Sequence, residues 1–464
     1  MPGFGFTPAR SPRMVDGDQE PHIGTRTATS ITDSEPLMHD PSRPSQAPLY
    51  LQSYDGALGR KIIDLHIWAV QQGLRGASTD LLFDGLCGRL AAAGVPLWRG
   101  FAGMRTLHPQ WAGYAYTWQR DRDGVEPAQI ERSQAYEQDV ADSPFAALIR
   151  EAEGGTEPGA TPRLRRRLAG PETRLDFPIL ERLAAAGATD YFAQLVTFAK
   201  GDPSRGQGIG FSFATDRPDG FSEDDLTLIR AVLPAASLAI MTYAGYTIAS
   251  GLLAAYLGGD AGRRVHAGAV ERGSVESMRA VLWYADIRSS TAIADAWEGP
   301  VIIELLDEVF EQLAAPLRSR GGQVLKFLGD GLLATFPLGE AAADEVCSRA
   351  LDAAAEAMAG LDRLSAARAE TGKPIAAVDL ALHLGEVLYG NVGAVDRLDF
   401  TVIGPAVNEV ARIETLCEPL GRKVLVFAEF AGALGDSPRL RPLGRHELRG
   451  VREPREIYAL DLGA

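Results

Sequence analysis

The spacing of apolar residues divides the N-terminal half of the chain into helical and extended segments. Apolar residues recur at three- and four-residue intervals over 61–74, 79–94 and 176–187, which predicts three amphipathic helices. Runs rich in aromatic and β-branched residues, bounded by Gly and Pro, predict four strands at 96–108, 113–121, 190–200 and 206–216. The last two runs flank a turn that contains Gly and Pro, and we expect them to form a hairpin.

A long helix is predicted to begin after Ser222, a favourable N-cap residue that is followed by acidic side chains. Residues 231–257 carry no charge, and an uncharged run of that length is long enough to span a bilayer. The run is rich in Ala, Gly, Ser, Thr and Tyr, which weakens membrane insertion, and it follows a heptad pattern. We therefore expect a soluble, dimer-forming helix. The heptad positions are Val232, Ala239, Tyr246 and Leu253, followed four residues later by Ala236, Tyr243, Ser250 and Leu257.

In the C-terminal half, an apolar run of strand type ends abruptly at Asp286 and is followed by Ser289, Ser290 and Thr291. A carboxylate at the end of a strand, next to the backbone amides that open a helix, suits a metal-bound polyphosphate. Because the metal takes the carboxylate and the turn takes phosphate oxygens, these residues are candidates for a nucleotide site.

A second carboxylate lies at the tip of a predicted hairpin. Strand-like runs at 323–328 and 332–336 flank the turn Gly329-Asp330-Gly331. If the neighbouring strands bring Asp330 beside Asp286, the pair matches the arrangement that holds two divalent ions for in-line phosphoryl displacement. Taken alone, Asp330 would be an ordinary Asp-Gly turn residue.

Asn408 and Arg412 lie four residues apart on a helix predicted from Ala406 onward, so they share one face. An amide and a guanidinium on one face suit the orientation of a ribose and the stabilisation of charge on a reacting phosphate. A solvated helix surface would show the same spacing.

Composition narrows the class of protein. The length of 464 residues predicts two or three domains. Apolar side chains make up 46% and charged side chains 23%, which is close to the average of globular proteins. The 61 acidic and 46 basic residues give a net charge of −15, which argues against a nucleic-acid partner. Three separated cysteines argue against a disulfide framework or a cysteine-based zinc site. With no apolar signal core at the N-terminus, we expect a cytoplasmic protein.

Three further features of the N-terminal half have both a functional and a structural interpretation. The arginines of the loop-like stretch 154–173 could bind a phosphate, although a solvated helix face is favoured. Two histidines could bind haem and three tryptophans could line a ligand pocket, although core or surface roles are favoured for all five. These residues are Arg163, Arg165, Arg166 and Arg167, then His66 and His108, then Trp98, Trp111 and Trp118.

Residues 50–245 resemble a GAF-type sensor domain in their order of elements and in the phrase F-S-x-x-D-x-x-L before a long helix. Such a domain binds a small ligand or forms dimers, so the resemblance implies an unknown small-molecule or protein signal. The boundaries expected are a disordered tail at 1–47, an α/β sensor domain at 48–245 and a linking helix at 246–274.

Residues 275–464 resemble the catalytic domain of a class III nucleotidyl cyclase. The resemblance rests on five phrases in family order: YADIRSST, GGQVLKFLGDGLLATFP, H-x-G-E-V-x-x-G-N-V-G, FTVIGPAVNEVARIE and ELRGVREPREIYAL. It implies a ferredoxin-like α/β sandwich that works as a homodimer, with active sites at the subunit interface. The activity implied is adenylate cyclase, which converts ATP to 3′,5′-cyclic AMP and pyrophosphate with two Mg²⁺ or Mn²⁺ ions.

The resemblance implies a role for each site residue. Asp286 and Asp330 match the metal ligands, together with the carbonyl of Ile287. Lys326 matches the adenine-selecting lysine, and Thr401 occupies the position of its partner. Asn408 and Arg412 match the pair that orients the ribose and stabilises the transition state. The residues that would touch the triphosphate are Ser289, Ser290, Thr291 and Arg449.

Two residues depart from the commonest family pattern, and neither removes a catalytic group. Thr401 stands where many members of the family have Asp, and its hydroxyl oxygen can still accept a hydrogen bond from the adenine amino group. Pro405 replaces an Asp and is acceptable in the first turn of a helix. A guanylate cyclase and a catalytically silent nucleotide-binding dimer are the alternatives. A guanylate cyclase is expected to have Glu and Cys at positions 326 and 401. A silent dimer is expected to have lost a catalytic residue.

Overall fold

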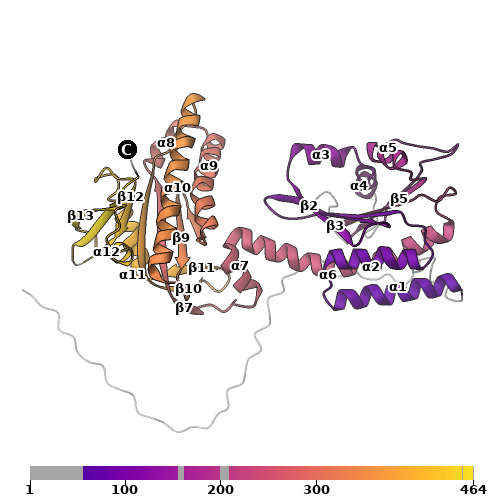
Figure 1. The fold of residues 1–464 in the computed structure, drawn as a ribbon, viewed down its shortest axis with the longest axis horizontal. Coiled ribbons are helices and arrows are strands. Elements are labelled where there is room, and N and C mark those ends of the chain that lie inside the picture. Colours follow the sequence, from indigo (N-terminus) through magenta and orange to yellow (C-terminus); the bar gives the residue numbers. More distant parts are fainter. Residues whose placement is uncertain (1–55, 155–160, 199–207, 452, 463–464) are drawn as a thin grey trace, which may run out of the picture. The chain divides into compact units, whose positions relative to one another are not determined.

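The computed structural model describes residues 56–154, 161–198, 208–451 and 453–462 (Figure 1). The tail expected at 1–47 and the turn expected at 201–206 lie outside the described residues. The expected mixed helix and sheet content is confirmed, with one sheet in each half of the described chain. The two domains are described separately below.

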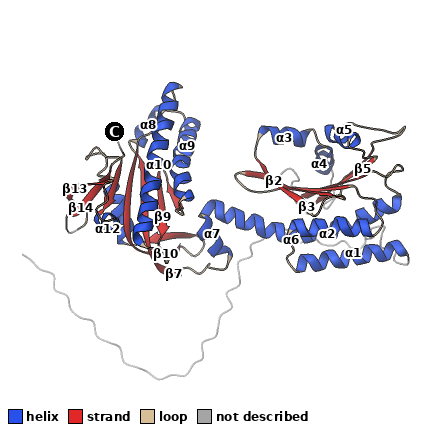
Figure 2. Cartoon of the chain, viewed as in Figure 1, coloured by secondary structure: helices blue, strands red, loops and turns tan. Residues whose placement is uncertain are grey.

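The N-terminal domain is built on a six-stranded antiparallel sheet of order β3-β2-β1-β6-β5-β4. Figure 2 shows α1, α2 and α6 on one side of this sheet and α3, α4 and α5 on the other. The strands are β1 (Arg99–Arg105), β2 (Trp111–Gln119), β3 (Val125–Glu131), β4 (Arg163–Arg167), β5 (Asp190–Thr197) and β6 (Gly208–Thr215). The helices are α1 (Ala57–Leu74), α2 (Thr79–Ala92), α3 (Gln134–Ala141), α4 (Pro144–Gly154), α5 (Pro178–Ala185) and α6 (Glu223–Leu257).

The helices and strands predicted in this domain are confirmed, including the pairing of β5 with β6. The apolar spacing did not reveal β3, α3 and α4, because their exposed faces are mostly polar. The three tryptophans lie in or beside the core, as favoured: Trp118 is buried, while Trp98 and Trp111 are half-buried. Both histidines bond to the backbone, His66 with the carbonyl of Ala231 at 2.7 Å and His108 with the amide of Gln110 at 3.2 Å.

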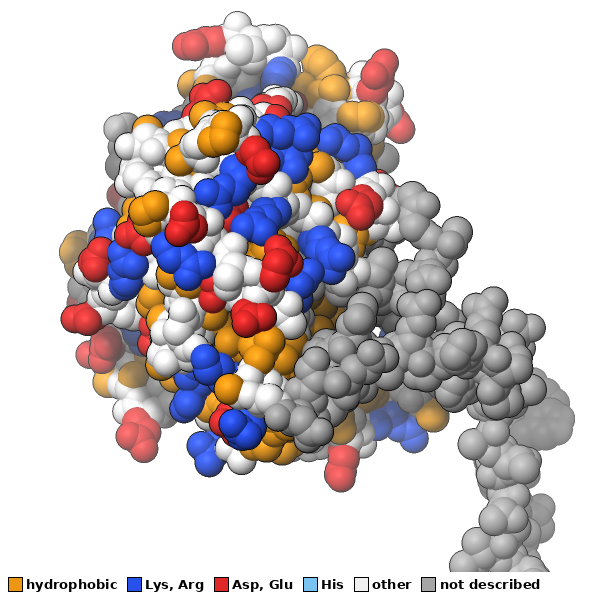
Figure 3. Space-filling view, turned by 90° about the vertical axis from the view of Figure 1, so that its right-hand side faces the viewer, with side chains coloured by type: hydrophobic (Ala, Val, Ile, Leu, Met, Phe, Trp, Pro, Cys, Tyr) orange, Lys and Arg blue, Asp and Glu red, His pale blue; other side chains and the backbone are white. Residues whose placement is uncertain are grey.

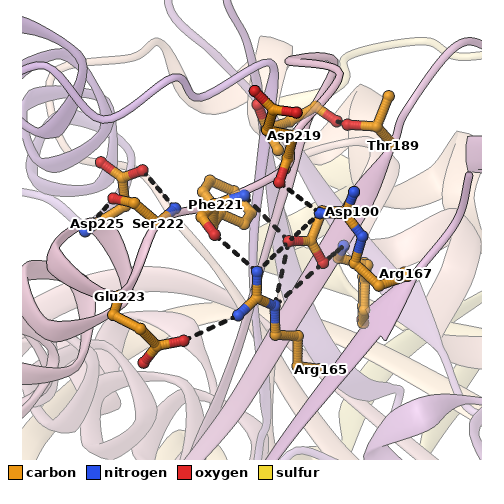
Figure 4. Close-up of polar contacts among 12 residues, drawn as sticks. Arg165, Arg167, Thr189, Asp190, Asp219, Phe221, Ser222, Glu223 and Asp225 are labelled. Atoms are coloured by element: carbon orange, nitrogen blue, oxygen red, sulfur yellow. Dashed lines mark hydrogen bonds and ion pairs between the residues drawn. The ribbon is translucent and has the colours of Figure 1, made fainter. Parts of the chain in front are cut away.

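The arginine cluster at 163–167 forms the edge strand β4, so the expectation of a solvated helix face was wrong. The reason lies at Asp190, which is fully buried and collects several of these charges (Figure 4). Its Oδ2 atom lies 2.8 Å from Arg165 Nη2 and 3.4 Å from Arg167 Nη1, and it accepts the Phe221 amide at 3.0 Å. A third arginine, Arg166, pairs with Asp176 at 2.9 Å. Because these arginines are already paired with carboxylates of the same domain, they are poorly suited to bind a phosphate ligand.

Acidic and basic side chains alternate on the surface as well. Figure 3 shows the side of Figure 1 that carries α5 and β5, where Lys and Arg are interspersed with Asp and Glu.

Helix α6 begins with the predicted N-cap. The hydroxyl of Ser222 accepts the Asp225 amide at 3.2 Å, and Asp225 Oδ2 accepts the Ser222 amide at 2.8 Å, which completes a capping box. Among the described residues, α6 is the one helix long and apolar enough to cross a membrane, and 61% of its most apolar window is buried. Such burial is also typical of a core helix.

The heptad positions of α6 divide between two environments. Val232, Ala236 and Ala239 are buried within the N-terminal domain, where Gly73 of α1 approaches so closely that an added Cβ would lie 3.0 Å from the backbone of Ala239. Further along, Tyr243 and Tyr246 are 36% and 62% exposed. Because α1 covers the first half of the helix, a dimer seam along the second half stays a prediction.

The C-terminal domain contains a sheet of order β13-β14-β12-β10-β7-β9-β8, with β11 paired to β10. The sequence β7-α9-β8-β9-α10-β10 gives the strand order β10-β7-β9-β8, which is the expected ferredoxin-like arrangement. Its strands are β7 (Val275–Ile287), β8 (Gln323–Leu328), β9 (Gly331–Pro337), β10 (Val378–Gly393), β11 (Leu398–Ile403), β12 (Val424–Phe427), β13 (Leu440–His446) and β14 (Arg455–Leu460). Its helices are α7 (Gly259–His266), α8 (Ser290–Ala296), α9 (Gly299–Ser319), α10 (Ala343–Glu370), α11 (Pro405–Glu414) and α12 (Ala428–Ala433).

Each face of this sheet has its own core. Residues of α9 and α10 pack with Trp283 and Phe336 on one face, and residues of α11 pack with Phe400 and Phe427 on the other. Successive residues of β7 therefore alternate between two buried faces, which explains why the central strand is nearly continuous in apolar residues. The polar residues that end it stand at the edge of both cores.

Candidate active site

The strand register brings the two predicted metal-binding carboxylates together. Strand β7 ends with Asp286 and Ile287, and Asp286 lies directly opposite Gly331, the first residue of β9. Asp330 precedes Gly331 in the β8–β9 turn, so its carboxylate is adjacent to that of Asp286. A Cβ added at Gly331 would lie 3.1 Å from Asp286 Oδ1, which shows how closely the turn approaches this carboxylate.

The electrostatics of this pair fit a divalent cation. Burial, followed by the charge of Asp330, raises the pKa of Asp286 to about 6, and the 3.0 Å bond from the Ile287 amide only partly opposes this shift. Two crowded carboxylates with oxygen donors to spare are ligands that Mg²⁺ and Mn²⁺ accept. The described residues contain no larger group of His, Cys, Asp or Glu arranged to hold a metal.

A third acidic residue near the pair was missed by sequence reasoning. Glu414, at the end of α11, is buried, and burial followed by the charges of Asp286 and Asp379 raises its pKa to about 7. A signal was present: Glu414 falls on the stripe of α11 that is otherwise apolar, in line with Ala406, Val410 and Ile413. An acidic residue on a buried stripe is itself a mark of a special environment.

Asp379 lies opposite Asp286 on the other side, in β10. Its carboxylate is held by the guanidinium of Arg288, with N–O distances of 2.5 and 3.0 Å. Arg288 therefore satisfies the charge of Asp379, whereas Asp286 and Asp330 face each other.

The turn predicted to bind phosphate follows directly after β7. Ser289 adopts a left-handed conformation with φ of 55°, and its carbonyl accepts the amides of Ala292 and Ile293 as α8 begins. A residue other than glycine in this region is uncommon and marks a tightly specified turn. Ser289 and Thr291 are exposed and Ser290 is half-buried, so the turn is open to a ligand.

Helix α11 carries Asn408 and Arg412 as predicted. Asn408 is exposed and Arg412 is half-buried, and a Cβ added at Gly450, in the turn that contains Arg449, would lie 3.4 Å from Arg412 Nη2. Gly385 of β10 lets the helix approach the sheet, because an added Cβ there would lie 2.5 Å from Ala406 Cβ.

The helix is also held by an ion pair that sequence reasoning did not foresee. Glu409, next to Asn408, lies 3.2 Å from Nε2 of His383, a buried residue of β10. The hydrogen bond to His383 lowers the pKa of Glu409 below its usual range. This contact fixes the rotation of α11 and with it the direction of Asn408 and Arg412.

Lys326 of β8 pairs with Asp399 of β11. Thr401, the predicted partner, lies two residues further along the same strand and therefore on the same face. Asp399 is thus a candidate site residue that sequence reasoning missed. The pairing of Lys326 with Thr401 at a bound base stays a prediction.

Within one chain, the predicted residues fall into two groups. Among the described residues, no hydrogen bond or ion pair joins Lys326, Asn408 or Arg412 to the carboxylate pair. The carboxylate pair, with the turn that follows β7, can bind a metal and a polyphosphate. The group of Lys326, Asn408 and Arg412 can bind a base and a ribose.

Comparison with known proteins agrees with this geometry. Residues 275–461 match the family model "Adenylate and Guanylate cyclase catalytic domain". These residues form a class III nucleotidyl cyclase catalytic domain. The cyclase domain, with its sandwich of β7–β10, α9 and α10, carries every residue of the predicted active site.

Relatives of this cyclase domain have been named for their activity. An "Adenylate cyclase" of Anabaena cylindrica is 32% identical over 196 residues, which are 41% of this chain and 38% of that protein. "Adenylate cyclase 2" of Rhizobium meliloti is 29% identical over 187 residues, 40% of this chain and 50% of that protein. A solved bacterial light-regulated adenylyl cyclase is 22% identical, covering 40% of this chain and 92% of that chain, with a TM-score of 0.36. The chain thus spans half or less of the length of the curated relatives.

Proposed function

We propose that this protein is an adenylate cyclase that converts ATP to 3′,5′-cyclic AMP and pyrophosphate. The observation that carries the proposal is the pair Asp286 and Asp330, two crowded carboxylates beside an open, tightly specified turn. Three curated relatives of the cyclase domain are named as adenylate cyclases, which favours ATP.

Asp286, Asp330 and the carbonyl of Ile287 are the groups that would hold the metal ions. Two bound Mg²⁺ or Mn²⁺ ions would supply activation of the ribose 3′-hydroxyl and neutralisation of the polyphosphate. The backbone amides and hydroxyls of Ser289, Ser290 and Thr291 would donate hydrogen bonds to the phosphate oxygens.

The second group of residues would act on the nucleoside. Lys326 would donate a hydrogen bond to a ring nitrogen of adenine, and the Thr401 hydroxyl oxygen would accept one from the adenine amino group. Asn408 orients the ribose. Arg412, together with Arg449 from the neighbouring turn, would stabilise the charge that develops on the reacting phosphate.

A homodimer is proposed because the two groups of residues must meet. Three apolar side chains near the predicted base-binding residues are exposed to solvent. Their exposed fractions are 53% for Phe327 and 43% for Leu328 of the edge strand β8, and 45% for Ile403 of β11. Apolar side chains exposed next to polar site residues are typical of a protein–protein interface. A second copy placed there would complete two equivalent sites with the groups of both chains.

Guanylate cyclase activity is the alternative, since the family model includes both activities. Lys326 disfavours it, because a lysine cannot accept the proton that guanine presents at its ring nitrogen. We further propose a cytoplasmic enzyme whose N-terminal domain senses a signal and regulates the cyclase domain.

The direct test is production of cyclic nucleotide by the purified full-length protein. We expect cyclic AMP from ATP in the presence of Mn²⁺ or Mg²⁺, and much less cyclic GMP from GTP. Nucleotide binding without product would instead support a silent regulatory dimer, and a preference for GTP would support the guanylate cyclase.

A further inference from the structure

The N-terminal domain contains a cavity of 570 Å³ between its sheet and the layer formed by α3, α4 and α5. Its volume lies in the range of small-molecule binding sites, which is roughly 300–1,000 Å³. The walls are mainly apolar and aromatic: Phe101, Tyr114, Ile130, Tyr136, Phe145 and Tyr191. None of the three tryptophans considered as pocket residues contributes to them.

Small residues on the sheet keep this space open. Strand β1 contributes Gly103 and strand β6 contributes Gly210 and Ser212 to the floor of the cavity. A Cβ added at Gly210 would lie 2.7 Å from the ring of Phe145, so the glycine allows this ring to lie against the sheet as a wall.

Arg99 of β1 places a positive charge inside the cavity. It is half-buried, and its guanidinium lies 5.7 Å from the centroid of the Phe101 ring. In the described part of the chain, no ion pair gives Arg99 a carboxylate partner, whereas Arg105, two residues along, binds Glu137 at 2.7 and 2.8 Å. A guanidinium that is withdrawn from water is normally paired, so Arg99 is an unusual feature.

A second arginine strengthens the field at the same place. Arg182 of α5 also lines the cavity, and its charge and the burial of Arg99 both lower the pKa of Arg99, with burial the larger cause. Asp139 and Asp142, also among the lining residues, are exposed and half-buried, and Asp142 accepts a bond from Gln138 at 2.9 Å. Water screens acidic groups at the rim more effectively than it screens the charge of Arg99.

We propose that this cavity binds an organic anion with an apolar body, whose carboxylate, sulfonate or phosphate group is held by Arg99 and Arg182. The aromatic walls contact the apolar body, and the anionic group takes the place of a carboxylate partner, which no ion pair supplies to Arg99 or Arg182 among the described residues. The ligand class follows from the N-terminal domain alone and does not depend on whether the cyclase domain turns over ATP.

The probe for this site is 8-anilinonaphthalene-1-sulfonate, compared with N-phenyl-1-naphthylamine, which has the same rings without the sulfonate. Both become fluorescent in apolar surroundings, so titration of the full-length protein gives a dissociation constant for each. We expect saturable binding of the sulfonate at one site per chain. Arg99→Gln should weaken it about tenfold or more, as loss of a hydrogen bond to a charged group predicts.

Three comparisons make the test specific. Arg99→Gln should leave the affinity for the neutral amine within about twofold, because the apolar walls remain. Arg182→Gln, at an exposed position of α5, tests the same charge without disturbing the core. Arg122→Gln, an exposed arginine paired with Glu126, is the matched control and should change neither affinity.

Near-ultraviolet circular dichroism and thermal unfolding establish that each variant is folded. The proposal is overturned if the native protein binds no sulfonate, or if Arg99→Gln and Arg182→Gln bind it as tightly as the wild type. It is also overturned if the sulfonate and the neutral amine lose affinity equally, since the site would then recognise only apolar surface. The assay does not measure catalysis, so failure here is distinguishable from failure of the proposed cyclase activity.

Discussion

Asp286 and Asp330 are far from each other in sequence, yet a single register of β7 against β9 makes them neighbours. Burial and, after it, the charge of Asp330 raise the pKa of Asp286, and the repulsion between the two carboxylates is relieved when a cation lies between them. The pair therefore carries a cost in the metal-free protein that metal binding removes.

Asp286→Asn and Asp330→Asn should each reduce turnover of ATP to a few per cent or less, because each removes a ligand from a two-ion site. The fold should persist, since Asp286 lies near the end of β7 and Asp330 lies in the β8–β9 turn. Asp295→Asn, an exposed residue of α8, is the control and should retain full activity. Substantial activity in either site variant would show that the metals bind elsewhere.

The pH dependence of the metal-free protein has a definite sign. Because the folded-state pKa of Asp286 is raised to about 6, the folded chain binds this proton more tightly than the unfolded chain. Its contribution to the free energy of unfolding therefore falls as pH rises between about 4 and 6. A divalent cation binds the ionised form.

Added Mn²⁺ should consequently raise the melting temperature more at about pH 8 than at about pH 5, where it competes with the proton. Scanning calorimetry at both values, with and without Mn²⁺, measures this. Asp330→Asn should abolish most of the difference, and an equal effect of Mn²⁺ at both values would contradict the assignment.

Lys326→Glu should reduce turnover of ATP and lower the preference for ATP over GTP, because a carboxylate can accept a hydrogen bond from the ring N–H of guanine. Lys373→Glu, at an exposed lysine paired with Glu304, is the matched control. The ratio of kcat/KM for ATP and GTP is the measurement, and an unchanged ratio would move base selection to other residues.

The carboxylate pair and the pair on α11 could be predicted because each stands at a strand end or on a helix face. The contact of Asp399 with Lys326 could not be predicted, because it depends on β11 lying near β8. Glu414 was visible only as an acid on an apolar stripe, and its neighbours became known from the packing of α11.

At the scale of elements, charged residues were harder to place than apolar ones. The arginine-rich segment 163–167 was expected on a helix face but forms β4, because Asp190 supplies a buried counter-charge that the local sequence does not reveal. Helix α6 was predicted correctly from its N-cap and apolar length, yet the burial of its first half depends on the distant α1. Local patterns thus predict an element, and long-range contacts decide its partners.

Asp190 joins β4, β5 and the turn before α6, so its loss should loosen all three (Figure 4). Asp190→Ala should lower the free energy of unfolding by about 3 kcal/mol or more, because two half-buried arginines lose their fully buried counter-charge. Asp216→Ala breaks the exposed pair with Arg120 and should cost about 1 kcal/mol or less. Urea denaturation of both variants gives the comparison, and equal losses would contradict a special role for Asp190.

At the scale of the whole molecule, one chain holds every predicted site residue, and among the described residues no hydrogen bond or ion pair joins Lys326, Asn408 or Arg412 to the carboxylate pair. In the proposed homodimer, the carboxylate pair of one chain and the group of Lys326, Asn408 and Arg412 of the other chain form one site. An Asp286→Ala chain and an Arg412→Ala chain should therefore each be inactive alone, for different reasons.

The most direct test of the shared active site is the activity of these two variants when they are co-expressed. In a mixed dimer, one site carries both substitutions and the other carries neither. Random assembly places half of the dimers in the mixed form, each with one of two sites intact. Cyclic AMP production should therefore recover to about a quarter of the wild-type value if the sites act independently. Detection of mixed dimers by differential tagging, without any recovery of activity, would contradict the account.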